Sequence, residues 1–273
     1  MQLLVQFIMR LSFGLAAAML CVSPRQVTSG YYRNNMYVLL GLGVLASLVA
    51  WMAPADSAIP VWPAVLVAAA SYVGAVAWLY EKAGPGFIAL AAIAASSLTG
   101  AWLSQANAAK DAPVGVVTTD GVAPRSTAPQ MAGVSGTLRT LDPVAGGLVL
   151  GVTMAAMLLG HWYLNAPGMS LAPLKRLVTC MVAALLVRGA LAGAGLVLEL
   201  GAAGAFDLSQ WLFVAMRWLM GLVGGLIVAF MARQTLKIPN TQAATGILYV
   251  GVVFAFVGEL TAQLLSRGKP FPL

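Results

Sequence analysis

Charged residues are scarce in this chain of 273 residues: Asp, Glu, Lys and Arg together make up 8% of it, and 60% is hydrophobic. Soluble domains contain roughly 25% charged residues, so a water-soluble surface cannot be built from this composition. The mean hydropathy of +0.89 agrees with that exclusion. The composition therefore predicts a protein that is largely embedded in a lipid bilayer.

Alternating hydrophobicity with a period of two is also absent, which argues against a transmembrane barrel. The chain instead contains apolar runs of about 20 residues, the length of one helical crossing of a bilayer. This pattern predicts an all-α, polytopic integral membrane protein with about eight transmembrane helices. The expected spans are Leu3–Val22, Asn34–Met52, Val61–Tyr80, Gly86–Ser104, Pro143–Leu164, Leu171–Leu200, Leu208–Met231 and Thr241–Leu265.

The segment 105–142 differs from the rest because it has no aromatic residues and is rich in Ala, Gly, Thr, Pro and Val. Such a segment cannot form much of a core, so we predict a polar external loop or linker. It would separate a first four-helix membrane half, residues 1–104, from a second four-helix half, residues 143–273. A weak likeness between the halves leaves open a parallel repeat about an axis along the membrane normal.

Basic residues are distributed unevenly between the two sides of the predicted bundle. The loops 53–60 and 201–207 contain no Lys or Arg, whereas the connections on the other side are basic. The positive-inside rule places the basic side in the cytoplasm and both termini, with the 105–142 loop, outside it. The predicted location is a membrane, in a bacterium the inner one. The basic side contains Arg25, Arg33, Lys82, Lys175, Arg176, Arg233 and Lys237.

Three charged residues fall inside the predicted spans of the second half: Arg188, Arg217 and Glu259. Each costs about 2.5–3.5 kcal/mol at the centre of a membrane helix, so each needs a partner, water or a ligand. Helical spacing puts Arg217 on a face with small residues, which is typical of helix contacts in lipid. We expect Arg188, Arg217, Glu259 and Tyr249 to line one polar pocket. Arg10, early in the first span, is expected to extend to the membrane surface.

The role of this pocket has two interpretations. Glu259 pairs with an arginine and locks the bundle, or the pocket binds an anionic or carbonyl-bearing ligand or transfers protons. Two arginines against one glutamate leave a positive charge over, and Glu199, the other acidic residue nearby, is expected near the membrane surface. An uncompensated arginine favours a ligand such as a quinone carbonyl, a carboxylate or a phosphate.

The only histidine, His161, precedes Trp162 and Tyr163 at the end of the fifth span. Aromatic residues are typical of the membrane interface, so an interfacial histidine is the expected reading. Met157 lies one turn earlier on the same face, and His with Met can ligate haem iron. With one histidine, a bis-histidine haem within the chain is excluded, which leaves quinone contact or a haem shared with another subunit.

Motifs of soluble catalysis are absent: there is no P-loop, dinucleotide-binding glycine motif, HExxH or GxSxG. No metal-ligand spacing and no basic patch for nucleic acid occurs either. Catalysis by this chain alone is not expected, although intramembrane chemistry on lipids stays open.

The function expected from the sequence is that of a non-catalytic membrane subunit of a respiratory or electron-transfer complex, with a quinone or lipid pocket in the second half and further subunits as partners. One alternative is a small-solute or proton-coupled transporter, and another is a membrane scaffold with purely structural ion pairs.

Overall fold

The computed structural model describes residues 1–53, 60–110, 128–166, 168–203, 206–238, 240–267, 269 and 271–273. In this part of the chain the regular structure is helical, and eight helical segments are long and apolar enough to cross a membrane. The prediction of an all-α polytopic membrane protein is confirmed.

The first group of helices consists of α1 (Gln2–Leu20), α2 (Ser29–Trp51), α3 (Trp62–Leu79) and α4 (Ala83–Lys110). The second group begins with α5 (Ala128–Asn165) and α6 (Ala172–Ala203) and ends with α9 (Thr241–Leu265). Its third span is composite: α7 (Leu208–Met216), the π-helix η2 (Arg217–Gly224) and α8 (Gly225–Thr235) follow one another without a break.

Helix α5 begins earlier than the expected span Pro143–Leu164. It starts at Ala128, and α4 extends to Lys110, so both ends of the segment 105–142 are helical; residues 111–127 lie outside the described residues. Pro143, which we interpreted as a helix start, lies inside α5. Proline removes only one backbone donor, and membrane helices tolerate it.

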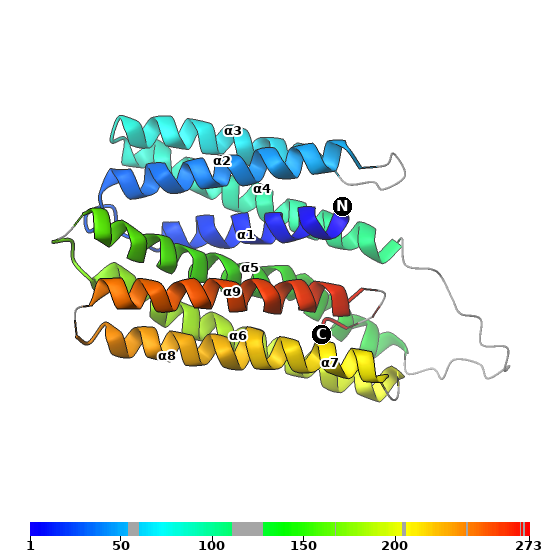
Figure 1. Ribbon diagram of the computed structural model, residues 1–273. Helices are drawn as coiled ribbons and strands as arrows, with labels where there is room; N and C mark the ends of the chain where they lie inside the picture. Colours follow the sequence, from blue (N-terminus) through cyan, green and yellow to red (C-terminus); the bar gives the residue numbers. More distant parts are fainter. Residues whose placement is uncertain are drawn as a thin grey trace, which may run out of the picture.

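Helices α1 and α5 lie at the centre of the bundle, with α2–α4 on one side and α6–α9 on the other (Figure 1). In the first group α1 contacts α2 and α4, which both contact α3; in the second, α5 contacts α6 and α9, which both contact α8. We call the end at which α1 begins and α9 ends the N-terminal end of the bundle. The basic connections lie at the opposite end.

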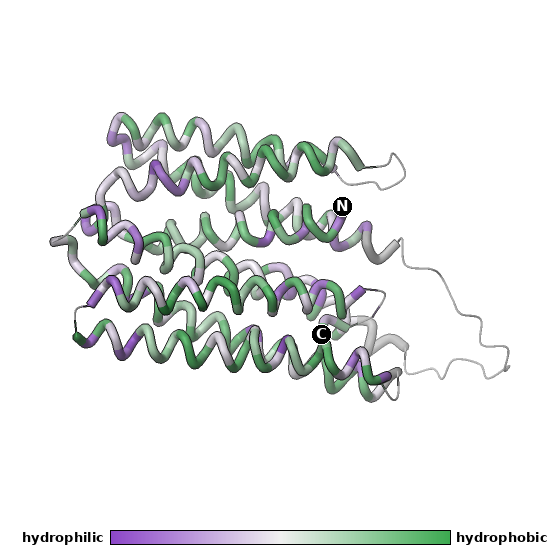
Figure 2. Tube along the Cα trace, in the orientation of Figure 1, coloured by the Kyte–Doolittle hydropathy of each residue, from purple (hydrophilic) through white to green (hydrophobic). Residues whose placement is uncertain are grey.

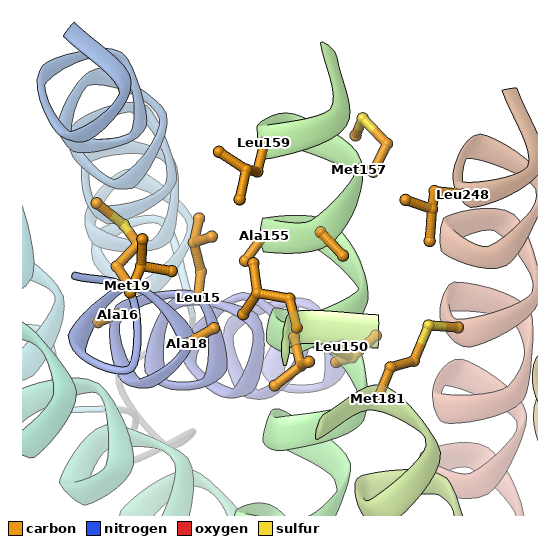
Figure 3. Close-up of a cluster of buried hydrophobic side chains, with 14 of the residues drawn as sticks. Leu15, Ala16, Ala18, Met19, Leu150, Ala155, Met157, Leu159, Met181 and Leu248 are labelled. Atoms are coloured by element: carbon orange, nitrogen blue, oxygen red, sulfur yellow. The ribbon is translucent and has the colours of Figure 1, made fainter. Parts of the chain in front are cut away.

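Glycines bring α1 and α5 into direct backbone contact. A Cβ atom on Gly14 would overlap the backbone of Gly147, and one on Gly151 would overlap the backbone of Gly14 and Leu15. Towards the opposite end, apolar side chains fill the space around this contact (Figure 3). Leu15, Met19, Leu150, Ala155 and Leu159 are all fully buried there.

The outer surface of the bundle is apolar, as a lipid-facing surface must be. Large hydrophobic side chains such as Tyr72, Ile88 and Val197 are more than half exposed. Hydrophobic residues predominate along most of the helices, and hydrophilic residues concentrate near the helix ends (Figure 2). The chain is therefore an integral membrane protein whose environment is the lipid bilayer.

The close contact of α1 and α5 predicts a strong effect of adding one methyl group. Gly151→Ala should lower the melting temperature of the purified protein in detergent, because overpacking costs about 1–3 kcal/mol and here the neighbour is backbone. Gly41→Ala is the matched control, since a Cβ at Gly41 meets nothing within 4 Å. Equal melting temperatures for the two variants would contradict the contact.

Candidate functional site

Five ionisable side chains meet inside the bundle: Arg10 of α1, Asp142 of α5, Arg188 of α6, Arg217 of η2 and Glu259 of α9. We call them the ionic cluster. Each is buried, with 1% to 4% of its surface exposed. Arg10 lies eight residues after the start of α1 at Gln2, which is about 12 Å along the helix axis. The cluster therefore lies well within the transmembrane part of the bundle.

Arg188 is the centre of the ionic cluster. Its Nε and Nη2 atoms donate to the two carboxylate oxygens of Glu259 at 2.6 and 2.9 Å. Its Nη1 atom donates to Oδ1 of Asp142 at 2.6 Å. A planar guanidinium that contacts both oxygens of one carboxylate is the strongest geometry available to an arginine. One side chain thus holds α5, α6 and α9 together.

Arg10 adds the first group of helices to this network. Its Nη2 atom donates to Oδ2 of Asp142 at 2.5 Å, and its Nη1 atom lies 3.8 Å from Oε2 of Glu259. Both oxygens of Asp142 therefore have an arginine partner. In the part of the chain that the structure describes, the Nε and Nη1 atoms of Arg10 have no hydrogen-bond partner. Arg10, which uses only part of its hydrogen-bonding capacity, therefore joins the two groups of helices.

Arg217 is buried but makes no direct contact with a carboxylate. Among the described residues, its two terminal nitrogens have no hydrogen-bond partner. It lies beside a cavity of about 10 Å³ that Glu259, Gly221 and Gly258 also line. This volume is at the lower limit for one water molecule. The guanidinium therefore faces a small space next to Glu259 rather than an ion-pair partner.

The charges of the ionic cluster do not cancel. Three arginines against two carboxylates give a net charge of 3 − 2 = +1 when all five groups are ionised. Removing one member of a buried ion pair typically costs about 3–5 kcal/mol, because the other charge is left uncompensated. Within the described residues the nearby Glu199 does not supply the missing charge, since it lies 3.6 Å from Lys269 instead.

Glycines make room for this concentration of side chains. A Cβ on Gly146, one turn after Asp142, would collide with the carboxylate of Glu259 and lie 3.2 Å from Nη1 of Arg10. Gly221 and Gly258 bring η2 and α9 into backbone contact beside Arg217. Arg217 also begins the π-helix, a rare geometry that is frequent at functional sites.

A vestibule leads from the N-terminal end of the bundle to the ionic cluster. It is a cavity of about 40 Å³ whose inner wall includes Arg10 and Asp142. The rest of its lining is mostly polar and comes from α1, α4, α5, α9 and the residues after α9. These residues are Gln6, Gln105, Arg139, Gln263, Ser266, Arg267, Lys269, Phe271 and Pro272.

The structure brings together Arg188, Arg217 and Glu259, but Tyr249 does not join them. Tyr249 is 47% exposed and faces away from the bundle, so its placement in the pocket was wrong. It lies ten residues before Glu259, which rotates it about 80° off that residue's face at 100° per residue. The inward face of α9 instead contains Thr245, Leu248 and Gly251, all buried.

Two members of the ionic cluster were missed from the sequence. Arg10 was expected to extend to the membrane surface, which is wrong, because it is 2% exposed and paired with Asp142. Asp142 was assigned to the external segment 105–142, but it lies inside α5. The sequence contains one signal that could have located Asp142. If a helix continues through Pro143, Asp142 lies one turn before Gly146 and Gly147. Its carboxylate then lies on the face of small residues that packs against other helices.

His161 and Met157 do not contribute to the ionic cluster. His161 is exposed near the end of α5, and 19 residues separate it from Asp142, about 28 Å along the helix. Met157 is 6% exposed and lies on the side of α5 towards α9 (Figure 3). Trp162 donates to Oγ1 of Thr28 at 2.8 Å. The described residues contain no group of three or more His, Cys, Asp or Glu that could hold a metal ion.

Comparison with known proteins identifies no relative: no protein-family model, no curated protein and no solved structure matches this chain. The fold and the site define its class as a polytopic, all-α integral membrane protein with a buried ionic cluster. Its function is therefore argued from the chemistry of that site.

The ion pair between Arg10 and Asp142 crosses the centre of the bundle and predicts a strong thermodynamic coupling between these two residues. Asp142→Leu should lower the free energy of unfolding by about 3–5 kcal/mol, because it leaves the buried Arg10 without its hydrogen-bonded carboxylate. Arg10→Met should lower it by less, because Asp142 keeps its hydrogen bond to Arg188. The double variant should recover part of the loss caused by Asp142→Leu. Denaturant unfolding in mixed micelles measures all three.

The control combines Arg10→Met with Lys237→Met, an exposed residue at the opposite end of the bundle, and these two effects should add within about 0.5 kcal/mol. Purely additive losses for Arg10 and Asp142 would contradict the ion pair.

Proposed function

We propose that this protein is a transporter that moves a small solute through the interface between its two groups of four helices. The observation on which this proposal depends is that the ionic cluster draws on both groups. Arg10 belongs to the first, and Asp142, Arg188, Arg217 and Glu259 belong to the second. Transport sites lie between repeats near the middle of the membrane, where one group moves against the other.

The uncompensated positive charge of the ionic cluster supports a functional role of the cluster over a purely structural one. Replacing buried ion pairs by hydrophobic residues is often neutral or stabilising, so such pairs are weak evidence for a stabilising role. Arg217 adds a third buried guanidinium whose terminal nitrogens lack partners. Intramembrane charges of this kind typically belong to substrate or ion pathways. Arg217 is therefore assigned the role of attracting an anionic group towards the cluster.

Access from one end and closure at the other also support transport. The vestibule reaches Arg10 and Asp142 from the N-terminal end. Towards the opposite end, the space between α1 and α5 is filled by fully buried apolar side chains such as Leu15 and Leu159. Among the described residues, a cavity therefore approaches the cluster from one side, and apolar packing closes the other. In the proposed cycle, separation of Arg10 from Asp142 lets α1 and α5 move apart.

The orientation follows from the basic residues at the opposite end. Lys175, Arg176, Arg233 and Lys237 all lie there, and the positive-inside rule assigns that end to the cytoplasm. The vestibule then faces outward. In a bacterium, the membrane concerned is the inner one.

A second candidate function is that of a quinone-binding membrane subunit of an electron-transfer complex. A cleft of about 310 Å³ between α4 and α5 favours it, lined by Trp102, Gln105, Ala106, Arg139 and Thr140. A volume near 300 Å³ is at the lower end for small-molecule sites, and arginine suits a quinone carbonyl. Purification from native membranes in mild detergent tests this function. It predicts co-purifying haem or flavin subunits, and a colourless lone chain would count against it.

Transport is tested by light-scattering swelling of proteoliposomes in potassium bicarbonate, nitrate and chloride with valinomycin and in the uncharged solutes glycerol and urea. The wild-type protein should accelerate swelling in at least one of them. Arg217→Met should reduce that rate at least tenfold, because loss of a charge-assisted contact costs about 1.5–3 kcal/mol.

Gln234→Leu, on the exposed surface of the same span, is the matched control and should retain the wild-type rate. Swelling no faster than in protein-free vesicles for every solute would overturn the transport proposal. An unchanged rate in Arg217→Met would remove Arg217 from the pathway.

A further inference from the structure

We propose that the vestibule is a binding site for a small planar oxyanion, of which bicarbonate matches the exposed hydrogen-bonding groups best. This inference rests on the proposed function in one respect, that the bound oxyanion is the transported solute. The binding site itself is argued from the vestibule alone.

Gln263 provides the first observation. Its side chain lines the vestibule, and the residue is 5% exposed. Neither Nε2 nor Oε1 has a hydrogen-bond partner among the residues that the structure describes. A buried amide without partners costs about 1–3 kcal/mol relative to a satisfied one. Gln263 thus presents one free donor group and one free acceptor to the cavity, and a ligand that satisfies both would recover this cost.

Arg10 provides the second observation. It lines the same cavity, and its Nε and Nη1 atoms have no hydrogen-bond partner within the described ranges of the chain. Its Nη2 atom is already occupied by Asp142. Nε and Nη1 lie on different sides of the guanidinium, and Nη1 lies 3.8 Å from Oε2 of Glu259, so Nε is the donor of Arg10 that remains for one oxygen of an oxyanion. Asp142 does not compete, because Arg10 and Arg188 occupy both of its oxygens.

The mouth of the vestibule has an excess of positive charge. Arg139, Arg267 and Lys269 line it. The Nη2 atom of Arg139 donates to the carbonyl oxygen of Lys269 at 2.8 Å, which holds this wall to α5. The ammonium of Lys269 lies 3.6 Å from Glu199 and 4.0 Å above the ring of Phe206, so it is partly compensated. Such a mouth raises the local concentration of anions and repels cations.

The size of the cavity limits the ligand. A volume of about 40 Å³ corresponds to roughly three water molecules at 10–15 Å³ each. Bicarbonate and nitrate, with four heavy atoms in a plane, match this size better than a tetrahedral sulfate or phosphate. Chloride accepts hydrogen bonds but donates none to Oε1 of Gln263. Bicarbonate supplies both, because one of its oxygens accepts from Arg10 and its hydroxyl donates to Gln263.

The test uses the full-length protein in lipid nanodiscs and measures NMR line broadening of isotope-labelled bicarbonate, with nitrate and chloride as competitors. We expect saturable binding that unlabelled bicarbonate displaces, and that nitrate and chloride each displace at least tenfold less effectively, because neither donates a hydrogen bond to Oε1 of Gln263. Gln263→Leu should weaken bicarbonate binding about tenfold to a hundredfold, the range for a hydrogen bond to a charged group. Gln242→Leu, at the exposed opposite end of α9, should bind like the wild type.

Folding is checked separately. Gln263→Leu should melt at the wild-type temperature or above, because it removes two unpartnered buried groups. Should it fail to fold, Arg267→Gln on the exposed rim is the second variant, with binding expected to weaken about twofold to fivefold at low salt and to match the wild type at high salt.

Three results would overturn the oxyanion site: no saturable bicarbonate binding, unchanged binding in the folded variants, or chloride binding as tight as bicarbonate. Failure of the transport proposal is distinguishable. Oxyanion binding without swelling in any solute supports the site and contradicts transport, whereas swelling in another solute without oxyanion binding does the reverse.

Discussion

Arg188 and the two carboxylates that it contacts are the interaction on which the rest of this structure depends. A single buried guanidinium makes three charge-assisted hydrogen bonds to Asp142 and Glu259, at 2.6 to 2.9 Å. Ions in a bilayer are tolerated when they face one another inside a bundle, because lipid offers no competing partner. The ion pairs therefore determine which faces of α5, α6 and α9 turn inward.

The glycines follow from the same requirement. Polar side chains of this size need helices that approach closely at some points and leave space at others. Contact of Gly14 with Gly147 and Gly151 brings α1 near enough for Arg10 to reach Asp142. Gly146 leaves the volume that the carboxylate of Glu259 occupies. Small residues and charges thus form one arrangement at the centre of the bundle.

The sequence was sufficient to predict the eight spans, because hydropathy over 20 residues reports directly on burial in lipid. It also identified Arg188, Arg217 and Glu259, since charges inside apolar runs are conspicuous. The sequence did not predict that Asp142 lies within a helix, because the proline that follows it is also typical of the first turn of a helix. The sequence placed Tyr249 on the wrong face of α9, because a small error in the assumed rotation per residue accumulates over the ten residues between Tyr249 and Glu259.

Which charged residues pair with one another could not be predicted from the spacing of residues within single helices. Arg10 was expected at the membrane surface, and its partner Asp142 is 132 residues away in the chain. The vestibule could not be predicted from the sequence either, because residues after α9 fold back over the N-terminal end of the bundle and form part of its wall. Lys269 and Phe271 belong to this wall and have no periodic pattern that would locate them.

Solid-state NMR of the protein in lipid bilayers, with isotope labels on arginine and aspartate, tests the ionic cluster most directly. Dipolar contact between arginine guanidinium nitrogens and the carboxylate carbon of Asp142 is predicted, together with the chemical shift of an ionised carboxylate. The signal should disappear in Asp142→Asn. A protonated Asp142, or one without an arginine nitrogen in contact, would contradict an ionic junction between the two groups of helices.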